Sequence, residues 1–176
     1  MSADVEGLFA EHHQQLFRYL YRALGHRETA RDMTQDVFLR VSRTKVPESS
    51  GSELQAWLFR IARNLLIDHH RRRRRSPEVA VAAGTPSRAA SQETGAAIRE
   101  ALADLADLDR DVFLMREVAG LDYDQIAAAC ELTTAAVRSR LHRTRLELRD
   151  RLTAPIADRC TAPMRLAARR THGHES

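Results

Sequence analysis

The chain has 176 residues, of which 43% are hydrophobic and 30% charged, and its 28 basic against 24 acidic side chains give a net charge of +4. This is the composition of a foldable, soluble protein with room for one ordinary domain or two small ones. The aromatic content of 5% argues against an all-β sandwich or barrel. No apolar run approaches the roughly 18 residues of a membrane-spanning helix. Two cysteines cannot form a disulfide framework, so we expect a cytoplasmic protein.

Apolar residues that recur at the helical period predict three helices in the first part of the chain. They are expected over residues 5–24, 28–43 and 53–74. Gly25 ends the first helix, because glycine is common just past a helix terminus. The Pro, Gly and Ser content of residues 45–52 predicts a loop. Ser52 is then the expected N-cap of the third helix, with Gln55 completing a capping box.

The third predicted helix has two different faces. Its apolar stripe consists of Leu54, Leu58, Ile61 and Leu65, and a second stripe consists of Arg60, Asn64, Ile67 and Arg71. The helix ends in five consecutive arginines, so residues 60–75 hold seven arginines against one aspartate. One face therefore suits a protein core, and the other suits a polar partner.

The small, polar and Pro/Gly-containing residues 76–96 predict a flexible linker. Helices follow over residues 97–106, from Asp109 as N-cap to Gly120, over 122–129 and over 134–149. The third of these begins with Asp122 as N-cap and Gln125 at the capping-box position, and Thr133 caps the last. The apolar stripe of the last helix is Val137, Leu141, Leu148 and Leu152. Residues 153–176 are expected to be a poorly ordered tail.

Charge is unevenly distributed along the chain. Residues 100–131 hold nine acidic side chains against two arginines, whereas residues 133–151 hold six arginines against two acids. Two basic segments separated by an acidic one indicate two contacts with a polyanion. The alternative for either basic segment by itself is a solvated helix face.

The last two predicted helices have the spacing of a helix-turn-helix unit, in which the second helix enters the DNA major groove. That second helix is rich in arginine, which reads guanine edges and binds phosphates. An ordinary helical hairpin with a charged outer face is the alternative.

At this point the sequence resembles the extracytoplasmic-function sigma factors of the sigma-70 family. Residues 121–148, LDYDQIAAACELTTAAVRSRLHRTRLEL, resemble sigma region 4. Independently, residues 30–41, ARDMTQDVFLRV, resemble region 2.2, and residues 56–68, AWLFRIARNLLID, with the arginine run after them resemble regions 2.3 and 2.4. The resemblance covers about residues 5–75 and 97–152, with the two motif sets in the family's order.

The resemblance implies specific roles for residues of the first half. Asp32, Gln35, Asp36 and Arg40 would bind core RNA polymerase. Trp57, Arg60, Asn64, Arg71 and Arg72 would contact the minus-10 DNA, although Trp57 lies beside the apolar stripe and fits a core position better. The loop 45–52 matches the family's position for capturing a flipped-out base, which repays the unstacking in a protein pocket.

For the second half, the resemblance implies recognition of the minus-35 duplex. The residues expected to do so are Thr133, Thr134, Arg138, Ser139, Arg140, His142, Arg143 and Arg145. The family usually has glycine in the turn of this motif, where a positive φ is needed, and this chain has Glu131. Cys130, at an apolar helical position, is interpreted as a buried structural thiol.

These observations predict an all-α protein with a sigma region 2 domain over residues 1–75 and a region 4 helix-turn-helix domain over 97–152. The implied partners are core RNA polymerase, through its beta-prime clamp and beta flap, promoter DNA, and an anti-sigma factor, often membrane-associated. No enzyme motif is recognised, so no catalytic residue, metal, cofactor or small-molecule substrate is expected. Two alternatives stay open: a helix-turn-helix regulator that binds duplex DNA alone, and a sigma-like decoy that binds an anti-sigma factor.

Overall fold

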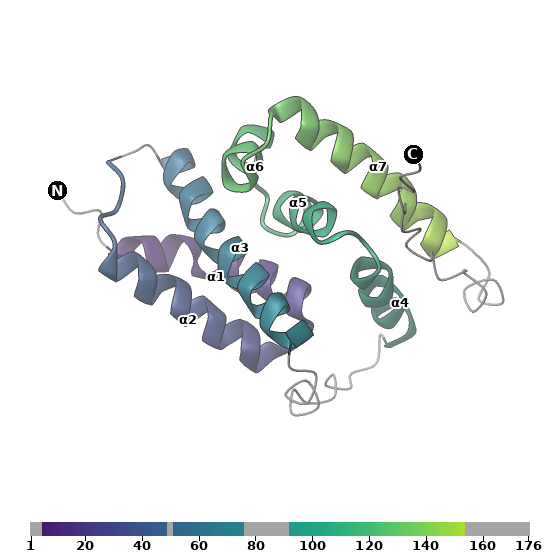
Figure 1. The fold of residues 1–176 in the computed structure, drawn as a ribbon, viewed down its shortest axis with the longest axis horizontal. Helices are drawn as coiled ribbons and strands as arrows, with labels where there is room; N and C mark the ends of the chain where they lie inside the picture. The colour runs from purple at the N-terminus through teal and green to yellow at the C-terminus, as the bar shows by residue number, and fades with distance from the viewer. Residues whose placement is uncertain (1–4, 49–50, 76–91, 154–176) are drawn as a thin grey trace, which may run out of the picture.

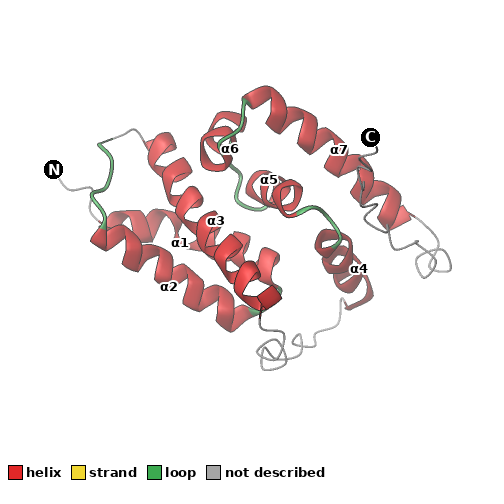
Figure 2. Cartoon of the chain, viewed as in Figure 1, coloured by secondary structure: helices red, strands yellow, loops and turns green. Residues whose placement is uncertain are grey.

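The computed structural model describes residues 5–48, 51–75 and 92–153, and these ranges form helices joined by short connections (Figures 1 and 2). The helices are α1 (Val5–Leu24), α2 (Arg27–Arg43), α3 (Gly51–Arg75), α4 (Gln92–Ala103), α5 (Asp107–Glu117), α6 (Tyr123–Cys130) and α7 (Thr134–Thr153). The predicted all-α fold class is confirmed. Among the described residues, no helix combines the length and the apolar character needed to cross a membrane.

The first three helices pack together as one bundle (Figure 1). Leu16 and Tyr19 of α1, Val37 of α2 and Phe59 of α3 belong to its core and have no solvent exposure. The rings of Tyr19 and Phe59 lie 5.5 Å apart in a tilted arrangement. Full burial of each such side chain stabilises the fold by about 1.5–3 kcal/mol. Phe59 was not part of the apolar stripe predicted for the third helix, and Ile61 of that stripe is only partly buried.

The remaining four helices form a second bundle around Leu114 and Met115 of α5, Ile126 of α6 and Leu141 of α7. Cys130 is buried there, with its Sγ atom 3.8 Å from Met115 Sδ, and burial raises the pKa of its thiol to about 11. The prediction of a buried structural thiol is confirmed. Leu152, in contrast, was expected on the apolar stripe of the last helix and is exposed.

Helices α3, α4 and α5 begin before their predicted starts. α3 begins at Gly51, so Ser52 lies in the first turn and is not the N-cap, and Gln55 instead bonds to side chains outside its own helix. α5 begins at Asp107 after the N-cap residue Ala106, so Asp109 is its third residue. Asp109 is used by another helix, as described below. α4 begins at Gln92, inside the segment 76–96 that was expected to be linker.

The ends of the helix-turn-helix were predicted correctly. The Asp122 side chain accepts from the Gln125 backbone at 2.7 Å, and the Gln125 side chain accepts from the Asp122 backbone at 2.8 Å, which is a complete capping box. At the second helix, Thr133 Oγ1 accepts a hydrogen bond from the backbone N–H of Ala136 at 3.2 Å. These caps fix where α6 and α7 begin.

The two bundles contact one another, which the sequence did not predict. α6 packs along α3 (Figure 1). α5 packs against α1. The hydroxyl of Tyr19 on α1 donates to Asp111 on α5 at 3.3 Å, and Arg63 of α3 donates to the same carboxylate at 3.2 Å. The expected separation into two bundles is therefore accompanied by a specific contact between them.

Candidate nucleic-acid and polymerase interfaces

The outer face of α2 presents the residues that were expected to bind polymerase. Asp32, Gln35, Asp36 and Arg40 are all exposed. They lie opposite the buried face of the helix, because residues three and four apart share a face. Leu39, which the sequence analysis did not single out, lies among them with 51% of its surface exposed. A mixed-charge face around an exposed leucine is suited to a protein partner.

A cleft with a volume of about 580 Å³ lies between α2 and the C-terminal part of α3. Its acidic wall includes Asp32 and Asp36, and its basic wall includes Arg72 and Arg73 with His69 beside them. Burial, followed by the charges of Arg73 and Arg72, lowers the pKa of His69. The structure thus brings part of the predicted polymerase set and part of the predicted DNA set to one cleft.

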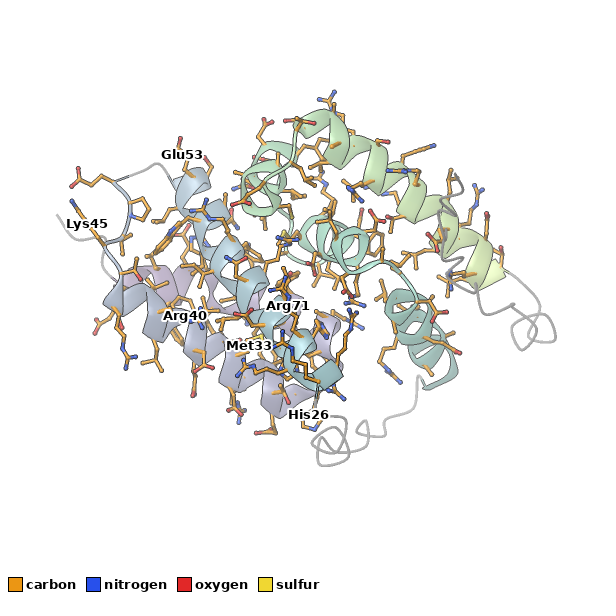
Figure 3. All side chains as sticks on the ribbon, viewed as in Figure 1. His26, Met33, Arg40, Lys45, Glu53 and Arg71 are labelled. Atoms are coloured by element: carbon orange, nitrogen blue, oxygen red, sulfur yellow. The ribbon has the colours of Figure 1, made fainter. Side chains whose placement is uncertain are left out.

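The polar stripe of α3 is exposed. Arg60, Asn64, Arg71 and Arg72 are open to solvent, and Figure 3 shows Arg71 near the C-terminal end of the helix. Trp57 is half-buried and packs against the hydrophobic core, in agreement with its interpretation as a core residue. In the preceding loop, Lys45 is exposed. Ser49 and Ser50 of the expected base-capturing loop lie outside the described residues.

The residues expected to read the minus-35 duplex do not share one environment. Arg138, Ser139, His142 and Arg143 are exposed on the first half of α7. Thr133 caps the helix, and the half-buried Thr134 donates to Asp124 of α6 at 2.8 Å, so both threonines hold the turn together. Arg140 is half-buried.

Two arginines of α7 are paired with acids of α5. Arg140 Nη1 lies 2.6 Å from Asp109 Oδ1, with both side chains about 29% exposed. Arg145 donates to Glu117 Oε1 through two nitrogens, the shorter contact being 2.6 Å. The acidic segment noted in the sequence therefore supplies partners for the basic helix. These ion pairs orient α7 on α5 and occupy the two guanidinium groups.

Tyr123 at the start of α6 provides a third support for the recognition helix. The guanidinium groups of Arg116 and Arg138 lie 5.1 and 5.8 Å from the centre of its ring. A cation over an aromatic face is attracted by the ring quadrupole. Arg138 is thus held by the Tyr123 ring while it stays exposed to solvent.

The turn between α6 and α7 has the backbone conformation that the missing glycine would favour. Glu131 adopts φ 58° and ψ 46°, and it is the one non-glycine residue with positive φ in the described ranges. Its backbone N–H bonds to the carbonyl of Ala127, and the following Leu132 N–H bonds to the same carbonyl at 2.9 Å. The turn geometry is retained despite the glutamate.

Comparison with known proteins follows the division of the fold. Residues 8–76 match the family model "Sigma-70 region 2", and residues 95–148 match "Sigma-70, region 4". The chain belongs to the extracytoplasmic-function sigma factors of the sigma-70 family. This is not a family of catalytic enzymes.

Relatives of this sigma factor span most of its length. It is 30% identical over 163 residues to RNA polymerase sigma factor YlaC of Bacillus subtilis, covering 85% of this chain and 92% of the relative. It is 33% identical over 149 residues to ECF RNA polymerase sigma factor SigL of Mycobacterium tuberculosis, covering 80% and 84%.

Solved structures have the same fold. The sigma factor RpoE of Bartonella quintana, crystallised with the anti-sigma factor NepR, aligns with a TM-score of 0.69 at 24% identity, covering 85% of this chain and 96% of that one. CnrH in complex with the cytosolic domain of CnrY aligns with a TM-score of 0.61 at 26% identity, covering 82% and 84%.

The region 2 match includes the α2 face and the α3 stripe of this sigma factor, and the region 4 match includes most of α7. Sequence reasoning missed the roles of the residues that support α7, namely Asp109, Glu117 and Tyr123. The acidic block before the basic one was a signal for the two acids alone, because a partner on another helix cannot be read from spacing within one helix.

Proposed function

We propose that this sigma factor binds core RNA polymerase and directs it to promoters, using region 2 at the minus-10 element and region 4 at the minus-35 element. The observation that carries this proposal is the exposed basic surface of α7, held in place by α5 and α6, in a chain that also matches region 2. The proposal assigns no covalent chemistry and no cofactor to the chain.

Two surfaces suit the polymerase itself. The α2 face with Asp36, Arg40 and the exposed Leu39 is proposed to bind the beta-prime clamp. In region 4, a groove of about 580 Å³ between α4, α5 and α7 is lined by Ile98, Leu102, Phe113, Leu148 and Leu152, with Glu117 and Arg145 also lining it. An apolar groove with charged neighbours suits an amphipathic helix. We assign it to the beta flap.

The DNA contacts divide between the two bundles. On α3, exposed Arg60, Asn64 and Arg71 can reach phosphates and base edges of the minus-10 region, and the arginine run adds salt-sensitive affinity. On α7, Arg138, Ser139, His142 and Arg143 are proposed to enter the major groove at the minus-35 element.

Regulation by an anti-sigma factor completes the proposal. Its support is that one aligned solved structure is a sigma factor in complex with an anti-sigma factor, and that the aligned CnrH is in complex with the cytosolic domain of CnrY. We place the protein in the cytoplasm, where polymerase and promoter DNA are found, and we propose that its anti-sigma factor is membrane-associated.

The test is run-off transcription with purified core polymerase on DNA from upstream of this protein's own gene. Core plus the sigma factor should give a discrete transcript. Arg138→Ala and Arg143→Ala should each lower its yield about tenfold, because a base-contacting arginine contributes about 1–3 kcal/mol. Asp36→Ala should weaken core binding. Arg149→Ala, an exposed arginine at the far end of α7, and Glu28→Ala on α2 are matched controls that should retain activity.

Other results would favour the alternatives. Salt-sensitive duplex binding without core, together with no transcript, would identify a regulator that binds DNA alone. Absence of transcription, core binding and duplex binding would leave the decoy that binds an anti-sigma factor.

A further inference from the structure

A carboxylate is buried where the two bundles meet. Asp111 of α5 is 2% exposed, although it belongs to region 4 and its hydrogen-bond donors belong to region 2. These donors are the Tyr19 hydroxyl on α1 and the Arg63 guanidinium on α3, whose side chain is itself only 18% exposed. A buried charge is costly unless it is paired and hydrogen-bonded, so these two donors replace the water that Asp111 loses when the bundles come together.

A relay of three amide side chains forms a second tie. Gln125 of α6 donates to Gln55 of α3 at 2.7 Å, and Gln55 donates to Gln15 of α1 at 2.8 Å. Gln125 also donates to the backbone carbonyl of Ser52 at 3.3 Å. The relay passes from region 4 through one region 2 helix to another.

A third tie joins the basic end of α3 to the start of α5. Arg74 donates to Asp107 Oδ2 at 3.0 Å, and Arg110 donates to Oδ1 of the same carboxylate at 2.8 Å. Arg74 is mostly exposed, so this tie is weaker than the other two. Together the three ties extend along α3 from its first turn to its last.

This arrangement is incompatible with simultaneous reading of both promoter elements. The minus-10 and minus-35 positions are about 25 base pairs apart, or about 85 Å along duplex DNA at roughly 3.4 Å per base pair. In the structure, α3 and α6 touch through Gln55 and Gln125, and only three residues separate α6 from α7. The sixteen residues between Arg75 and Gln92 can span at most about 55 Å, which permits separation of the bundles.

We propose that the sigma factor inhibits itself: region 4 docks on region 2 of the same chain through Asp111 and the glutamine relay, and this closed arrangement must open before promoter engagement. An anti-sigma factor then stabilises a state that the chain already adopts. The opening part of this proposal rests on the proposed function, and the closed arrangement does not.

The experiment weakens the first tie and removes the middle of the second while keeping both cores intact. Tyr19→Phe removes one hydroxyl and retains the ring that packs on Phe59, and Gln55→Ala removes the middle of the relay. The matched control combines Tyr21→Phe with Gln14→Ala, which changes the same residue types at exposed positions of α1. Small-angle X-ray scattering of the full chain reports its dimensions, and titration with core polymerase reports affinity. Circular dichroism verifies that each variant is folded.

The wild type and the control should be compact, and the Tyr19→Phe/Gln55→Ala variant should have a larger radius of gyration. Each lost hydrogen bond shifts the closed–open equilibrium about two- to tenfold, so the variant should bind core about tenfold more tightly, because only the open fraction is competent. An extended wild type, an equally compact variant, or an expanded variant with unchanged core affinity would overturn the proposal. Expansion of the variant with no core binding by any form would uphold the docking and reject the proposed function.

Discussion

Glu131 has a left-handed backbone conformation, which costs residues other than glycine about 1–2 kcal/mol. Glycine pays a smaller entropic cost of about 0.5–1 kcal/mol on folding. We therefore expect Glu131→Gly to stabilise region 4 by about 0.5–1 kcal/mol, measured as an increase in the free energy of unfolding in urea. Glu131→Ala, which keeps a Cβ atom, is the control and should give no such gain. A lower stability of the glycine variant would contradict this account of the turn.

Asp111 and His70 give the closed arrangement two opposing responses to pH. Burial raises the pKa of Asp111 to about 6, against the charges of Arg63 and Arg110, which lower it. Burial and the charge of Arg110 lower the pKa of His70 to about 4. The groups that face Asp111 are Tyr19 of α1, Arg63 of α3, Asp107 and Arg110 of α5 and Cys130 of α6.

The signs of the two responses differ. Folding favours the protonated form of Asp111, so its contribution to stability is fully present below about pH 4 and is lost as the pH rises through about 6. Folding favours neutral His70, so its contribution is lost as the pH falls from about 6.5 to about 4. As the pH is lowered from 7.5 to 5, the free energy of unfolding of the wild type should rise relative to that of Asp111→Asn. Over the same range it should fall relative to that of His70→Gln. Parallel pH profiles of all three proteins in urea unfolding would refute both assignments.

At the scale of elements, the start of α7 was predicted from the sequence, but the ion pairs that hold α7 on α5 were not. Helix periods and the caps at Asp122 and Thr133 depend on residues within four positions, so they were predictable. The pairing of Arg140 with Asp109 joins residues 31 apart in the chain. Its formation depends on how α7 crosses α5, and the same dependence explains why Asp109 was mistaken for a cap.

The Arg140–Asp109 pair predicts a division of labour on α7. Asp109→Ala and Arg140→Ala should each cost about 0.5–1 kcal/mol in unfolding free energy, and the double variant should cost no more than either one. In duplex binding, Arg138→Ala and Arg143→Ala should reduce the dependence of affinity on salt concentration by about one unit of slope each, whereas Arg140→Ala should change it less. Equal slopes for all three variants would show that Arg140 leaves Asp109 to contact DNA.

At the scale of the whole molecule, the contact between the bundles could not be predicted from the sequence. Tyr19, Arg63 and Asp111 lie far apart in the chain. The periodicity within each helix does not show that their side chains meet. The contact should couple the unfolding of the two bundles. We expect one calorimetric transition for the wild type and two for the Tyr19→Phe/Gln55→Ala variant. Two resolved transitions in the wild type would show that the coupling is negligible.

The groove between α4, α5 and α7 shares a helix with the DNA-reading surface. Leu148 and Leu152 line the groove near the end of this 20-residue helix, which is about 30 Å long, whereas Arg138 and Arg143 lie in its first half. Arg145, paired with Glu117, lies between these sets and lines the groove as well. If a ligand seated in the groove shifts Arg145 or α7, it would alter the affinity for duplex DNA, and by thermodynamic reciprocity duplex DNA would alter the affinity for that ligand by the same factor. Promoter strength would then depend on the groove's occupant as well as on the bases that α7 reads.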